Sequence, residues 1–194
     1  MKKLSEKKSL LIFGVILLVY GILFTLLKTG VIGAYYEGII LLTFINIILA
    51  VSLNLIVGFT GQLCLGHAGF MAIGAYISAI ISTKANLPFF LAIIVGAIVS
   101  AFFAALIGFP TLRLTGDYFA ITTLAFCEII RVIIMNIDYV GGARGFTGIP
   151  TKTTISISFW VMALTVIIIY NIIHSSQGRA MLAVRENEIA AESM

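Results

Sequence analysis

Charged residues and cysteines are scarce in this sequence. Of its 194 residues, 10% are charged and 61% are hydrophobic, whereas a soluble domain carries about 25% charged and about 45–50% apolar residues. The scarcity of charge excludes an ordinary soluble domain and a nucleic-acid partner, and the high apolar content excludes a disordered chain. Two cysteines exclude a disulfide scaffold and give no paired-cysteine zinc site. The net charge of +4 is typical of a membrane protein with basic cytoplasmic loops.

Long segments contain no Asp, Glu, Lys or Arg. They are 9–27, 38–83, 85–112 and 153–178, and the apolar segment 118–137 is interrupted only by Glu128 and Arg131. A helix needs about 20 residues to cross about 30 Å of hydrocarbon, and barrel strands would be shorter and alternate in polarity. We therefore predict an all-α integral membrane protein, a bundle of about six transmembrane helices over 1–174 with a polar tail over 175–194. The expected spans are 10–27, 38–57, 61–83, 88–109, 117–137 and 154–174.

Basic residues indicate the orientation of the chain. Lys2, Lys3, Lys7 and Lys8 precede the first span and place the N-terminus in the cytoplasm. We predict an uncleaved helix rather than a signal peptide, because the apolar run exceeds about 7–15 residues and no small-x-small cleavage site follows it. Six crossings then return the tail to the cytoplasm.

Glycines interrupt the apolar run between the second and third predicted spans. Each disfavours one continuous helix, since glycine costs about 1 kcal/mol relative to alanine in a helix interior. One interpretation is a broken helix lining a translocation path, because irregular backbone in a bilayer is tolerated where it lines a wet cavity. The other is a short loop before a tightly packed helix. The candidate path residues are Asn54, Gly58, Gly61, Gly66, His67 and Gly69.

His67, Glu128 and Arg131 lie in the interior of the predicted spans, away from their first and last residues. No second His, Cys or carboxylate lies at metal-ligand spacing from His67, so we expect a hydrogen-bonded packing histidine and no metal site. Glu128 and Arg131, at i and i+3, share one helix face that must point into the bundle or at water. They act as a gate or partner contact, or as an internal ion pair that fixes helix packing. No nucleophile or second carboxylate accompanies them, so no catalytic residue is predicted.

The tail 175–194 is polar and helix-prone. Gly178 opens a stretch rich in Ala and Glu, in which Ala180, Val184 and Ala191 are apolar at roughly helical spacing. The tail is therefore either a solvated extension of the last span or a short helix docked into a cytoplasmic partner. A docked helix would couple motion in that partner to the bundle.

Four blocks of the chain carry a family resemblance. Residues 54–76 (NLIVGFTGQLCLGHAGFMAIGAY) are similar to a pattern GxxSLGHAxFxxIGAY, with Cys64 where serine is more usual. Residues 112–126 (LRLTGDYFAITTLAF) and 141–150 (GGARGFTGIP) are similar to two further blocks, and 179–194 is similar to a coupling loop with an EAA motif. Together these blocks resemble LivM-type permeases, the branched-chain amino-acid subunits of bacterial ABC importers. That motif normally continues to a glycine and further helices, so the resemblance implies about the N-terminal two-thirds of such a permease.

The resemblance implies inward transport of branched-chain amino acids through a multi-pass protein of the bacterial plasma (inner) membrane. Its implied partners are an extracytoplasmic substrate-binding protein, a second homologous permease subunit and two cytoplasmic ATPase subunits. The chain contains no G-x-x-x-x-G-K-[ST] phosphate loop, so ATP is expected on the ATPase subunits and no cofactor is expected on this chain, which is not an enzyme. The implied ATPase contact lies in 179–192 and includes Arg179, Arg185, Glu188, Ala190 and Ala191.

Other functions remain open from the sequence. Close relatives of these permeases carry urea or short amides. An ion-coupled secondary transporter or channel would use Glu128, Arg131 and His67 as proton or ion sites. An intramembrane enzyme lacks a credible nucleophile and base, and a purely structural membrane subunit would be dispensable for transport.

Overall fold

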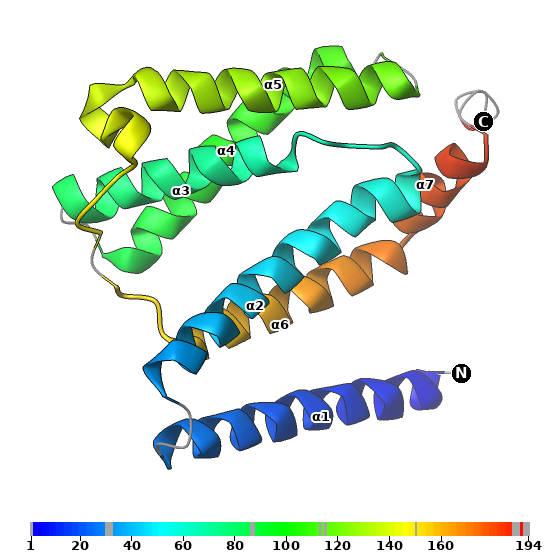
Figure 1. Cartoon of the computed structure of the whole chain (residues 1–194). Coiled ribbons are helices and arrows are strands. Elements are labelled where there is room, and N and C mark those ends of the chain that lie inside the picture. The colour runs from blue at the N-terminus through cyan, green and yellow to red at the C-terminus, as the bar shows by residue number, and fades with distance from the viewer. Residues whose placement is uncertain are drawn as a thin grey trace. The chain divides into compact units, whose positions relative to one another are not determined.

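The computed structural model describes residues 2–29, 33–85, 88–112, 114, 116–149, 151–187 and 191. Within these residues every regular element is a helix (Figure 1). The long helices are α1 (Lys2–Lys28), α2 (Ala34–Asn54), α3 (His67–Lys84), α4 (Phe89–Thr111), α5 (Asp117–Asn136), α6 (Ile155–Ile173) and α7 (Ser176–Glu186). The short elements are the π-helical segment η1 (Leu55–Thr60) and the 3₁₀ turns η2 (Asp138–Val140) and η3 (Gly142–Arg144).

Four helical segments among the described residues are long and apolar enough to cross a membrane. They are Tyr35–Thr60, Phe89–Thr111, Asp117–Asn136 and Ile155–Ile173. The first predicted span falls in α1, and within the part of α1 whose side chains are described the apolar segment is Ile16–Lys28. The third falls in α3, which begins only at His67 because 61–66 is not helical, and which ends at the charged Lys84. The described part of the chain is thus all-helical as predicted and contains four candidate spans. The count of six crossings stays a prediction.

The chain forms two compact units, each made of segments that are distant in sequence. The first unit comprises Met1–Ser52 and Thr153–Gln177, and therefore holds α1, α6 and nearly all of α2. Its core is aromatic: the Phe159 ring lies 5.2 Å from that of Tyr20 and 5.7 Å from that of Phe44. The Tyr20 hydroxyl donates a hydrogen bond to Ser156 Oγ at 3.1 Å. These contacts fasten both N-terminal helices of this unit to α6.

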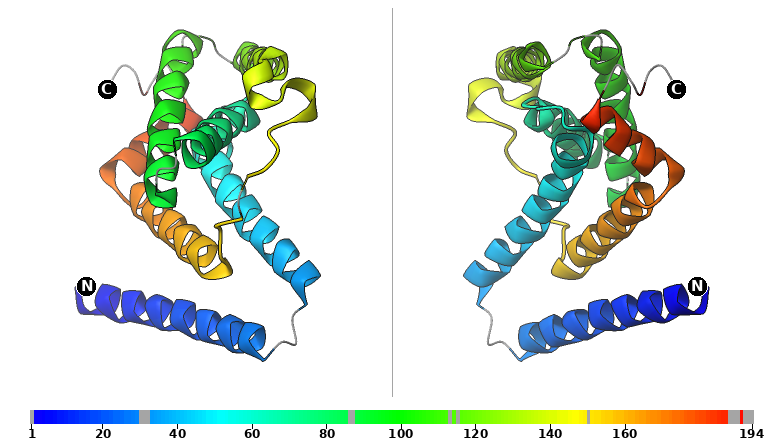
Figure 2. Two further views of the ribbon diagram at one scale, coloured as in Figure 1. Left: turned by 90° about the vertical axis from the view of Figure 1, so that its left-hand side faces the viewer. Right: turned by 90° about the vertical axis from the view of Figure 1, so that its right-hand side faces the viewer.

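The second unit comprises Leu53–Lys152 and Gly178–Met194. Inside it, α4 crosses α3 (Figure 2), and small residues let the two backbones approach closely. A β-carbon placed on Gly96 would lie 2.7 Å from the Gly74 carbonyl oxygen. The Ser100 hydroxyl donates to the Phe70 carbonyl at 2.7 Å. This pair of helices, with α5 against α3, positions the segment that carries the predicted break.

Candidate functional site

The helix break lies where the glycines predict it. The chain leaves α2 through the π-helical segment η1, turns at Gly61, continues without regular structure over 61–66 and re-enters a helix at His67. Gly61 has φ +74°, a left-handed conformation that glycine adopts without the steric cost of a β-carbon. Short π-helical segments within helices often occur at functional sites. The sequence predicted the break, but its π-helical form was not expected.

Two predicted path residues, Asn54 and Gly58, lie together at the start of the break. A β-carbon on Gly58 would collide with the amide oxygen of Asn54, so the absence of a side chain at Gly58 makes room for that amide. The Thr60 hydroxyl donates to the Ile56 carbonyl at 2.5 Å. Side chains of η1 therefore contact its own backbone, and the segment is compact.

The far end of the break is seated on α5. The backbone N–H of Leu65 donates to the hydroxyl of the buried Thr123 at 3.1 Å. A β-carbon on Gly66 would lie 2.7 Å from the Thr123 carbonyl oxygen, and one on Gly69 would lie 3.1 Å from the Cys127 α-carbon. Gly66 and Gly69 are thus positions of close helix contact, which is the second interpretation of the glycines. His67 is half-buried at the first residue of α3.

The C-terminal helix α7 reaches the same break. Arg185 Nη1 donates a hydrogen bond to the Gly58 carbonyl oxygen at 2.9 Å, across 127 positions of sequence. A β-carbon on Gly61 would lie 3.0 Å from Arg185 Cγ. The structure therefore joins two regions that the sequence identified separately, the glycine break and the tail resembling a coupling loop.

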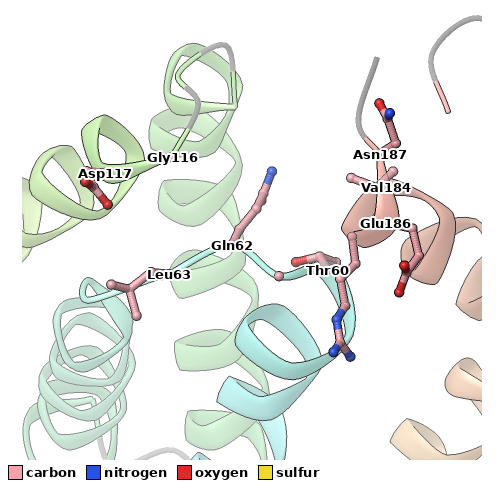
Figure 3. A pocket seen from close by; sticks show the side chains of 10 residues that line it. Thr60, Gln62, Leu63, Gly116, Asp117, Val184, Glu186 and Asn187 are labelled. Carbon is pink, nitrogen blue, oxygen red and sulfur yellow. The ribbon is translucent and has the colours of Figure 1, made fainter. Parts of the chain in front are cut away.

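A cavity of about 320 Å³ opens beside this contact. Three segments line it: the break, the start of α5 and the end of α7 (Figure 3). In Figure 3, Gln62 points up from the break, with Asp117 of α5 on one side and, on the other, Val184 of α7 and Asn187, which follows α7. The predicted topology places all three segments at the cytoplasmic ends of their spans. The lining residues are Thr60, Gly61, Gln62, Leu63, Gly116, Asp117, Val184, Arg185, Glu186 and Asn187.

Only some of the other predicted coupling residues lie in the part of the chain that the structure describes. Arg179 is an exposed residue of α7, and the Ala191 backbone N–H donates to the Asn187 carbonyl at 3.0 Å. Glu188, Ala190 and Glu192 lie outside the described residues. The contributions of Thr123, Asp117 and Gln62 were missed from the sequence. For two of them the sequence holds a signal: Thr123 is a polar residue within an apolar span, and Asp117 is a charged residue at the boundary of the same span.

The predicted ion pair forms on α5. Arg131 Nη1 lies 3.1 Å from Glu128 Oε2 and 3.3 Å from Oε1. The side chains of Arg131 and Glu128 are 64% and 53% exposed. Within the described part of the second unit no helix covers the pair, because both charges lie on an exposed part of α5. The two interpretations, a gate or partner contact and an internal pair that fixes helix packing, both stay predictions.

A second polar contact ties the opposite end of α3 to the turns after α5. Lys84 Nζ lies 3.1 Å from the centre of the Tyr139 ring and donates to the Tyr139 carbonyl at 3.3 Å. Residues 84 and 139 belong to two loops that the predicted topology places outside the cell. In the second unit, the segments predicted to be cytoplasmic therefore meet at the break. The segments predicted to lie outside the cell meet at the C-terminal end of α3.

Comparison with known proteins identifies the family. A family model described as "Branched-chain amino acid transport system / permease component" matches residues 35–194. The chain belongs to this family. It is a multi-pass membrane permease component and not an enzyme.

Curated relatives of this permease include the high-affinity branched-chain amino acid transport system permease protein LivM of Salmonella typhimurium (strain LT2) and of Escherichia coli (strain K12). Each is 32% identical over 160 residues, covering 64% of this chain and 38% of the relative. The permease thus spans well under half the length of the curated relatives it matches. No solved structure matches it.

Proposed function

We propose that the chain is the transmembrane permease subunit of a bacterial ABC importer that moves branched-chain amino acids inward. The family and the 32% identity to LivM proteins support this substrate class. An extracytoplasmic binding protein delivers the amino acid, a second homologous permease completes the path, and two ATPase subunits supply the energy. The N-terminus and α7 lie in the cytoplasm, as the basic residues of the N-terminus indicate.

The observation that carries this proposal is the hydrogen bond from Arg185 to the Gly58 carbonyl. An importer driven by separate ATPases needs a mechanical link between a cytoplasmic docking segment and the transmembrane helices. Here α7 contacts the backbone of the helix break directly, beside an open cavity of about 320 Å³. When an ATPase moves α7, Arg185 pulls on η1, and the break is where a helix bends at least cost because its regular hydrogen bonding is already interrupted.

Co-purification tests the proposal. The protein is expressed with its neighbouring transport genes and isolated through a tag at the N-terminus. We expect an ATPase pair and a second permease in fixed ratio, both lost or depleted when 179–192 is scrambled, and leucine uptake that requires ATP. A stable homo-oligomer without ATPase, with uptake driven by the proton gradient, would contradict the proposal and favour an ion-coupled transporter or channel. ATP-driven uptake of urea or short amides without leucine would contradict the substrate class alone.

A further inference from the structure

The exposed part of α5 includes one flank that carries charged side chains. The buried side is formed by Phe119, Ala120 and Thr123, and Cys127 and Ile130 approach Gly69 of α3. At 3.6 residues per turn, one exposed flank of the helix carries both charges of the ion pair together with apolar side chains. We call this the charged flank; its residues are Asp117, Ile121, Leu124, Glu128, Arg131 and Met135.

The charged flank is unsuited to lipid. It belongs to the candidate span Asp117–Asn136, and the ion pair lies near the middle of that span. A charged residue at the centre of a membrane helix costs about 2.5–3.5 kcal/mol on insertion scales, so such residues face water or protein. Glu128 and Arg131 are both more than half exposed, so what they face is not one of the described helices of the second unit. The flank begins at Asp117, which lines the cavity at the helix break.

The ion pair keeps unused hydrogen-bonding capacity of both signs. A guanidinium has five N–H donors and a carboxylate about four acceptor sites, whereas the pair is made through Arg131 Nη1 alone. The remaining donors suit a carboxylate and the remaining acceptors suit an ammonium. Leu124 and Met135, one turn to either side, offer apolar surface to an aliphatic side chain. This combination matches a zwitterionic amino acid with an aliphatic side chain, whereas a neutral amide leaves both charges unmatched.

We propose that the Glu128–Arg131 pair is a substrate contact in the translocation path, with Glu128 receiving the α-ammonium and Arg131 the α-carboxylate of a branched-chain amino acid. The proposal rests on the proposed function, since it takes its substrate class from there. The pair would contact the substrate directly, a role that we assign neither to the helix break nor to α7. The proposal also assigns the charged flank to the path rather than to lipid.

A neutral double variant tests the contact without leaving an unpaired charge. In the complete importer, E128Q/R131Q removes both charges together, and removing both partners avoids the penalty of one stranded ion. We expect assembly with the partner subunits and thermal stability to be retained, while ATP-driven L-leucine uptake falls at least about tenfold, the effect of losing one hydrogen bond to a charged group. Unchanged uptake would overturn the proposal. Loss of assembly would overturn it too, because the pair would then be a subunit contact.

Protection from labelling locates the substrate directly. Leu124 is on the charged flank, whereas Ile133, nine residues on, lies half a turn away; both are exposed, at 46% and 53%. With Cys64 and Cys127 replaced by serine, Leu124→Cys and Ile133→Cys are labelled in turn with a membrane-permeant thiol reagent in the complete importer. Saturating L-leucine is expected to slow labelling of Leu124→Cys about tenfold or more and to leave Ile133→Cys unchanged.

Equal labelling of Leu124→Cys with and without leucine would overturn the contact. This readout needs no ATP hydrolysis, so it separates the two proposals. Leucine protection without ATP-driven uptake would keep the substrate contact and reject the ABC importer. ATP-driven leucine uptake without protection would keep the importer and reject the contact.

Discussion

At the scale of single residues, the Arg185 side chain joins parts of the chain that are 127 positions apart. Its guanidinium reaches a backbone carbonyl, so the contact depends on the length and donor geometry of arginine rather than on a partner side chain. Gly61, whose absent side chain leaves room for Arg185 Cγ, allows the approach. The contact is thus defined by one long side chain and two glycines.

Replacing Arg185 is expected to uncouple transport from ATP hydrolysis. Arg185→Ala removes the bond to Gly58, and a hydrogen bond to a charged group contributes about 1.5–3 kcal/mol, so leucine uptake per ATP hydrolysed should fall about tenfold or more. The ATPase should still co-purify, because other residues of α7 remain. The matched control is the exposed Lys152→Ala, which removes one positive charge away from α7. An unchanged ratio of uptake to hydrolysis in Arg185→Ala would contradict the coupling role.

Two glycines of α4 differ in what an added methyl group meets. On Gly96 it would lie 2.7 Å from the Gly74 carbonyl oxygen, whereas Gly108 has nothing within 4 Å. Overpacking costs about 1–3 kcal/mol, while alanine in an open helical position gains up to about 1 kcal/mol over glycine. We therefore expect Gly96→Ala to lower the melting temperature in detergent, and Gly108→Ala to keep or raise it. Equal melting temperatures would contradict the close packing of α3 and α4.

At the scale of helices, local signals were predictable and long-range contacts were not. The break was placed correctly because glycine acts through the conformation of its own backbone, as at Gly61. The pairing of Glu128 with Arg131 follows from their i, i+3 spacing alone. Whether Glu128 and Arg131 are exposed or buried depends on which face of α5 packs against α3. The hydrogen bond from Arg185 to Gly58 depends on the packing of the whole second unit. No periodicity within one helix contains that information.

The turns after α5 are held to α3 by Lys84 above the Tyr139 ring. Tyr139→Ala removes the ring, and an exposed cation–π contact contributes about 0.5–1 kcal/mol, so the turns should open more often. Limited trypsin digestion is expected to cut faster after Arg144, which is an exposed residue of η3. Tyr139→Phe keeps the ring and should be cut at the native rate. Equal cleavage of the alanine and phenylalanine variants would rule out the ring contact as the tether.

At the scale of the whole molecule, the order of the spans fixes which loops share a side of the membrane. The predicted six crossings put 138–153 outside and 175–194 inside. In a background without Cys64 and Cys127, Thr151→Cys and Leu182→Cys, both exposed, are treated in intact cells with an impermeant thiol reagent. We expect labelling of Thr151→Cys alone, with Leu182→Cys reacting only after the cells are opened. Labelling of both from outside would contradict the orientation.

The two units interleave along the chain, and this has a consequence for synthesis. The first unit begins with α1 and α2 but needs α6 to supply Phe159, against which Tyr20 and Phe44 pack. The ribosome therefore delivers α3, α4 and α5 in full before the first unit can close. Arg185 follows later still, so in every nascent chain the Gly58 carbonyl lacks its hydrogen bond from Arg185 until translation has passed α6.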